Sequence, residues 1–111
     1  ADVRIAQQIA RAVRGSSGGL VHVKALGLLV DGQAQVSMNL TDYRKTPIHR
    51  VVELVRREAQ RHGVAIVRSE LIGLIPQQAL LEAATWYLQL DDVDSSRVLE
   101  NRLHGLTQQG E

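Results

Sequence analysis

Polar and ionisable side chains are concentrated between residues 35 and 49 of this chain. The set comprises Gln35, Ser37, Asn39 and Thr41 at alternate positions, the run Asp42-Tyr43-Arg44-Lys45, and then Thr46 and His49. Thr46 and Pro47 form a typical helix start, with a capping hydroxyl followed by proline at the first helical position. A loop between a strand and a capped helix is a common place for ligand chemistry, because exposed side chains and helix N–H groups meet there.

His49 is the histidine beside this loop, and the other three are scattered as His22, His62 and His104. A histidine at this place can act as a general base, or it can bond to the local backbone, and we favour the local structural role. The histidines lack the spacing of metal ligands, and we find no Ser/His/Asp motif and no paired carboxylates at helical spacing. The chain has no cysteine. We therefore assign no catalytic residue and expect no metal site.

The polar residues belong to a strand whose other face is apolar, with Ala34, Val36, Met38 and Leu40. This period of two is typical of a half-buried strand. Asp31-Gly32 predicts a tight hairpin to a preceding strand over residues 22–30. The polar face then requires water, a ligand or a second domain, and we favour a partner surface or cavity wall. Asp42 is best explained as a turn residue.

The remaining elements complete an α+β pattern. Asp2 caps a first amphipathic helix that ends near Gly15, and the Ser16-Ser17-Gly18-Gly19 connection is flexible rather than a phosphate cradle. A helix over 47–62 follows the strand pair, then a strand over 65–75, a helix over 77–90 and a short helix over 95–106 capped by Asp94.

The predicted order is αββαβαα, with an antiparallel sheet and helices on one face. One strand placed in front would make the first six elements βαββαβ, the ferredoxin-like motif. We interpret that first strand as missing, lying upstream or supplied by another chain. In the usual ferredoxin-like order it would be central. The alternative is a three-stranded sheet that closes without it.

Composition is that of one soluble globular domain over residues 1–111. The apolar share is 44%, the net charge is +1, and the aromatic residues number one Trp, two Tyr and no Phe. We expect no nucleic-acid partner, no membrane span and a cytoplasmic location. The chain begins at Ala1 without Met, which we interpret as a processed, truncated or excised start.

A long run of sequence carries a family resemblance. VSMNLTDYRKTPIHRVVELVRREA, with SSGGLVHVKALG before it and SELIGLIPQQALL after it, closely resembles the C-terminal subdomain of the glutamate formimidoyltransferase (formiminotransferase) family. The resemblance extends from the first helix to about Leu90. It implies two similar α/β subdomains whose sheets face each other across a tunnel that holds folate. The implied reaction moves the formimino group from N-formimino-L-glutamate to tetrahydrofolate, in histidine degradation and one-carbon metabolism.

The resemblance also implies which residues form the tunnel wall. The family's catalytic histidine and most folate contacts belong to the N-terminal subdomain or the connecting segment, so this chain alone is expected to be inactive and to need that subdomain as its partner. Arg44 or Lys45 would attract a glutamate carboxylate of the substrate or of the folate tail. Arg68 departs from the small residue expected at its position. The matching wall positions are Ser37, Asn39, Asp42, Lys45, Thr46 and His49 in the strand and loop, with Ser69 and Glu70 in the next strand.

Two other interpretations stay open. The chain could be a stand-alone ferredoxin-like module that binds a small ligand through its polar face, or dimerises through its open edge as a homodimer. It could also be a truncated relic without function.

Overall fold

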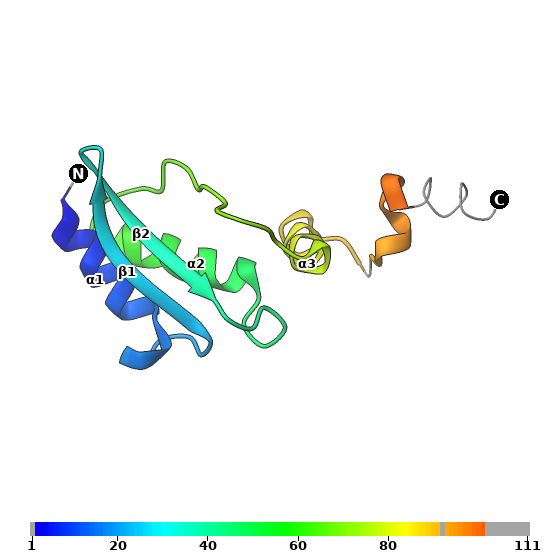
Figure 1. Cartoon of the computed structure of the whole chain (residues 1–111), viewed down its shortest axis with the longest axis horizontal. Helices are drawn as coiled ribbons and strands as arrows, with labels where there is room; N and C mark the ends of the chain where they lie inside the picture. Colours follow the sequence, from blue (N-terminus) through cyan, green and yellow to red (C-terminus); the bar gives the residue numbers. More distant parts are fainter. Residues whose placement is uncertain (1, 92, 102–111) are drawn as a thin grey trace. The chain divides into compact units, whose positions relative to one another are not determined.

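The computed structural model describes residues 2–91 and 93–101. The chain divides into two compact units between Gly73 and Leu74 (Figure 1). The first unit contains the predicted strands, loop and first two helices. The second contains the helical part. The expectation of a single domain stays a prediction.

Helix α1, Val3–Val13, forms as its amphipathic pattern predicts. The Asp2 carboxylate accepts a hydrogen bond from the Arg4 backbone N–H at 2.9 Å, and the Arg4 side chain also bonds to it. These bonds lower the pKa of the Asp2 carboxyl, which is the expected effect of donors on a capping carboxylate. The helix ends at Arg14, one residue earlier than predicted, and leads into the 3-10 turn η1, Gly15–Ser17. Its buried side chains are Ala6, Ile9, Ala10 and Val13.

Strands β1, Val23–Val30, and β2, Gln33–Leu40, form the predicted antiparallel hairpin. Asp31 and Gly32 have φ angles of 50° and 77°, the left-handed pair that a tight two-residue hairpin turn requires. Gly27 in β1 is needed for close approach, since a Cβ built there would lie 2.4 Å from the Gln7 backbone nitrogen of α1.

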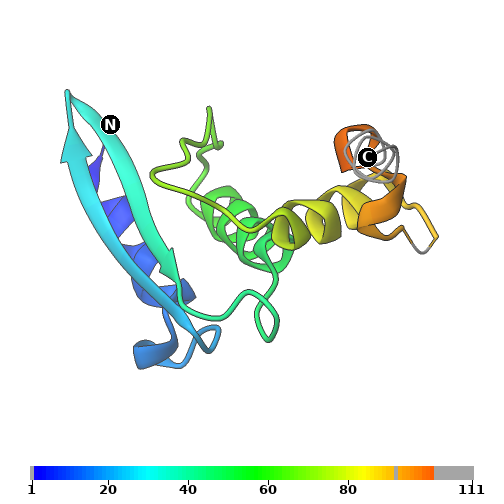
Figure 2. The ribbon, with the colours of Figure 1, turned by 45° about the vertical axis from the view of Figure 1, so that its right-hand side comes forward.

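The core of the first unit lies between one face of the hairpin and two helices. Helix α2 is Ile48–Arg61. Helix α1 packs on both strands, whereas α2 packs mainly on α1. In both ribbon views α2 lies on the β2 side of the hairpin (Figures 1 and 2). The buried apolar cluster comprises Ile9 and Val13 of α1, Val23 of β1, and Val51, Val55 and Ala59 of α2. The α+β class with helices on one sheet face is therefore confirmed.

The predicted strand over residues 65–75 is wrong. Residues 65–75 have no strand structure, and the sheet has two strands, so the three-stranded alternative is wrong as well. Val67 is 91% exposed and Ile72 79% exposed. A strand needs the N–H and C=O groups of a neighbour, and β propensity alone does not supply them.

The second unit contains helix α3, Gln77–Leu88, and the 3-10 turn η2, Ser95–Arg97. α3 ends two residues before the predicted Leu90, where Gln89 adopts a left-handed conformation. Asp94 accepts from the Ser96 backbone N–H at 3.0 Å, which confirms it as a cap. Residues 99–101 are helical, and the rest of the helix predicted to residue 106 lies outside the described residues. Among the described helices, none has the length and apolar character needed to cross a membrane.

Candidate functional site

The loop after β2 is closed by its own hydrogen bonds. The Asp42 carboxylate accepts from the Arg44 backbone N–H at 3.1 Å, and the Asp42 carbonyl accepts from the Thr46 N–H at 3.0 Å. This is the local bonding by which aspartate stabilises turns, and it supports the interpretation of Asp42 as a turn residue. Ordered backbone around residues 42–46 gives the exposed side chains between them a defined position.

Thr46 does not cap α2, contrary to the prediction. Its hydroxyl donates to the Val21 carbonyl oxygen at 2.6 Å, and the residue is 2% exposed. Pro47 is the residue that precedes the helix, and no side chain bonds to the first helical N–H groups there. Thr46 is turned into the protein, so it ties the loop to the start of β1 and is removed from the candidate ligand contacts.

The open face of the hairpin carries the predicted polar residues but is not uniformly polar. Ser37 and Asn39 lie on the face opposite the core, and their cross-strand neighbours are Leu26 and Lys24. Leu26 is 56% exposed. β2 thus contributes hydrogen-bonding groups to this face, while the middle of β1 contributes apolar surface. Such a mixed surface suits a ligand with flat apolar and polar parts, or a second protein layer.

Lys24 is a candidate that the sequence prediction missed. It is exposed, and it lies directly opposite Asn39 in the hairpin register. The signal was present: counting outward from the Asp31-Gly32 turn pairs Val30 with Gln33 and then Lys24 with Asn39. Only the pairing across strands reveals it, because the two residues are far apart in sequence.

A shallow, open depression lies beside the beginning of β1. Its volume is about 470 Å³, and it is bordered by the exposed side chains of His22 and Lys24 and by Arg14. Thr41, also at its rim, donates through its hydroxyl and its N–H to the His22 carbonyl, at 3.2 and 2.9 Å. These bonds and the Thr46–Val21 bond place the depression next to the loop. The full lining is Arg14, Gly15, Ser16, Val21, His22, Val23, Lys24, Ala25 and Thr41.

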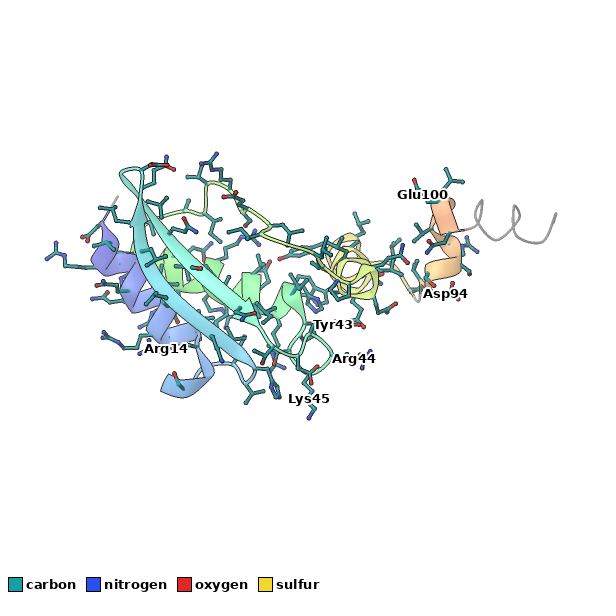
Figure 3. The ribbon with its side chains drawn as sticks, viewed as in Figure 1. Arg14, Tyr43, Arg44, Lys45, Asp94 and Glu100 are labelled. Carbon is teal, nitrogen blue, oxygen red and sulfur yellow. The ribbon has the colours of Figure 1, made fainter. Side chains whose placement is uncertain are left out.

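Basic groups therefore collect at this end of the hairpin. Figure 3 shows Arg44 and Lys45 on the loop after β2 and Arg14 near the end of α1. The Arg44 guanidinium lies over the Tyr43 ring, 5.7 Å from its centroid. Lys45 is exposed and takes part in none of the ion pairs within the described chain. We call Arg14, Lys24, Arg44 and Lys45 the basic end; its chemistry favours anionic ligands.

The structure does not bring the remaining candidates into this group in the predicted way. His49 is half-buried in the first turn of α2. Ser69 and Glu70 are exposed on the irregular segment, not on a strand that continues the sheet. The described residues contain no cluster of three or more His, Asp or Glu side chains that could hold a metal.

Comparison with known proteins gives a consistent result. The family model described as "Formiminotransferase domain" matches residues 1–103. Glutamate formimidoyltransferase of Thermoplasma acidophilum is 48% identical over 104 residues, which cover 92% of this chain and 34% of that protein. The Streptococcus pyogenes enzyme of the same name is 42% identical over 107 residues, covering 94% and 36%.

A longer relative matches over a similar part of the chain. Formimidoyltransferase-cyclodeaminase of Sus scrofa is 40% identical over 110 residues, covering 90% of this chain and 20% of that protein. The chain thus spans about a third of the two microbial relatives and a fifth of this one. The family match over nearly the whole chain shows that it belongs to the formiminotransferase domain family.

Proposed function

We propose that this chain is the C-terminal subdomain of a glutamate formimidoyltransferase and forms one wall of its folate tunnel. The observation that carries the proposal is the open hairpin face with the basic end, in a chain that belongs to the formiminotransferase domain family. One sheet face is covered by helices, and the other presents Ser37, Asn39 and Lys24. A sheet with that division of faces is suited to line a ligand site.

The basic end binds the carboxylates in this proposal. N-formimino-L-glutamate and the glutamate tail of tetrahydrofolate are both anionic at neutral pH, because glutamate carboxyl groups ionise near pH 4. Lys45 and Lys24 supply exposed ammonium groups, and Arg44 adds a guanidinium beside Tyr43. Ser37 and Asn39 hydrogen-bond to the polar parts of the bound molecules, and Leu26 packs against an apolar part.

Positioning is the chemical contribution of this chain. In the transfer, a folate nitrogen bonds to the formimino carbon, the bond from that carbon to the glutamate nitrogen breaks, and a proton passes from the incoming to the leaving nitrogen. Holding both reactants in one geometry can supply a large part of the rate enhancement. The general acid–base histidine belongs to the N-terminal subdomain, so this chain is inactive alone.

The test is a calorimetric titration of a reduced folate into the chain, alone and then mixed with a complementing fragment. That fragment is the part of the T. acidophilum enzyme outside the region matched by this chain. We expect binding and formimino transfer only in the mixture. Binding by the lone chain would favour an independent ligand-binding module. No binding in either sample would contradict the proposed function.

A further inference from the structure

The two edges of the hairpin are open for pairing with further strands. The Thr41 N–H donates to the His22 carbonyl, so those two residues form a hydrogen-bonded pair that continues the register. Bonded and non-bonded pairs alternate in an antiparallel ladder. The N–H and C=O groups of Leu29 in β1 and of its partner Ala34 in β2 therefore point to the outer edges. Along β2 the same holds for Val36 and Met38.

The two edges differ in their surroundings. The β1 edge is flanked at its beginning by the η1 turn, where Arg14 pairs with Leu20 in an isolated bridge. The β2 edge faces the side on which α2 lies (Figure 2). Because α2 packs mainly on α1 and contacts the hairpin little, no strand underlies it in the described chain. A helix of this kind ordinarily covers a sheet.

The irregular segment after α2 has the composition of a strand without a partner. Ile66 packs against the core cluster, whereas Val67, Leu71 and Ile72 are 91%, 60% and 79% exposed. Apolar side chains exposed to this degree on an unbonded backbone indicate a surface that another element covers. β-branched residues such as Ile66 and Val67 also favour extended structure once a neighbouring strand is present.

We propose that the free edge of β2 receives an extended strand from another part of the longer protein. The added strand runs antiparallel to β2, and residues 65–72 then pair with its other edge, which produces a four-stranded sheet beneath α1 and α2. Helix α1 runs antiparallel to β1, since Gln7 lies at Gly27 and Val13 at Gly19. A strand antiparallel to β2 therefore ends near the beginning of α1 and needs only a short connection. The proposal rests on the proposed function for the source of the strand.

Amide hydrogen exchange of the whole chain tests this proposal, with and without the complementing fragment and without folate. We expect slower exchange in the mixture at Ala34, Val36 and Met38 of β2 and at residues 65–72. Protection on β1 at Ala25 and Leu29 instead, or at neither edge, would overturn the proposal. Protection of β2 in the chain alone that rises with its concentration would assign the edge to a second copy and would also overturn it.

A matched proline pair gives an independent readout. Ala34→Pro removes an outward N–H from the β2 edge, and Leu29→Pro removes one from its direct partner on the β1 edge. Proline is tolerated where the N–H points away from the ladder, so both hairpins are expected to persist. Ala34→Pro should weaken association with the fragment about tenfold, and Leu29→Pro less than about threefold. Equal effects would contradict the proposal. Because no folate is present, a failed strand addition is distinguishable from failed folate binding.

Discussion

At the scale of single residues, Thr46 shows how a side chain can leave its expected role. Its hydroxyl is close to the helix start, but it bonds to the Val21 carbonyl, which lies 25 positions away in sequence. The bond joins the loop to β1 in a nearly solvent-free place. The position of Lys45, the next residue back, therefore depends on Thr46.

Thr46→Val should destabilise the first unit. The substitution keeps the shape and leaves the buried Val21 carbonyl without its donor, at an expected cost of about 1–3 kcal/mol. The free energy of unfolding from urea denaturation is the measurement. Thr41→Val is the control, because the Thr41 bond to His22 is exposed and its removal should cost less than about 0.5 kcal/mol. Similar losses for both variants would contradict the structural role given to Thr46.

Lys45 is the residue of the basic end on which the proposed carboxylate binding depends most directly. In the mixture with the complementing fragment, Lys45→Ala should raise the Kd for a reduced folate or the KM for the formimino substrate roughly tenfold, the loss expected for one charge-assisted contact. Arg57→Ala is the matched control, since it removes the same charge from the exposed surface of α2. If the two variants bind equally well, Lys45 does not contact the ligand.

At the scale of elements, the contact between α1 and β1 is the tightest feature of the first unit. It depends on Gly27, whose missing side chain allows the backbone of α1 at Ala6 and Gln7 to approach. Any Cβ would meet backbone atoms, which cannot move aside as a flexible side chain could. The helix and hairpin are therefore expected to separate slightly in any variant with a side chain there.

Gly27→Ala should lower the free energy of unfolding by about 1–3 kcal/mol, the range for overpacking a close contact. Gly18→Ala provides the comparison, because Gly18 has open space around it and a φ of 88°, so its substitution tests conformational strain alone. That strain should cost about 1 kcal/mol. Thermal or urea unfolding of both variants separates the two effects, and a neutral Gly27→Ala would refute the close packing.

At the scale of the whole molecule, the chain contains two compact units joined in a region without regular structure. Arg68 lies in that region and is exposed, with no backbone hydrogen bond around it among the described residues. The loop that contains Arg44 and Lys45 is, by contrast, closed by the Asp42 bonds.

Trypsin should therefore cut first after Arg68. Proteases cleave exposed segments that can adopt an extended shape, and local hydrogen bonds protect other exposed sites. Mass spectrometry of the early products measures the order, and Arg68→Gln should slow the first cut. A first cut after Lys45 would show that the loop is less ordered than its bonds suggest.

The sequence by itself determined the elements whose signals are local. Alternation from Ala34 to Leu40, the Asp31-Gly32 turn and the Asp2 cap predicted the hairpin and α1, because each depends on residues within a few positions. The same local signals placed Ser37, Asn39, Asp42 and Lys45 together at one junction. The family resemblance was likewise readable in the sequence, since it depends on residue order alone.

Tertiary structure decided what depends on distant partners. Thr46 had two acceptable hydrogen-bond arrangements, and the fold supplied the Val21 carbonyl. Lys24 joined the site only through its pairing with Asn39 across the hairpin. The segment over 65–75 had strand composition but no neighbour, so its backbone stayed irregular. A β-strand is not a local structure, because its hydrogen bonds belong to another segment, and sequence alone does not show whether that segment is present.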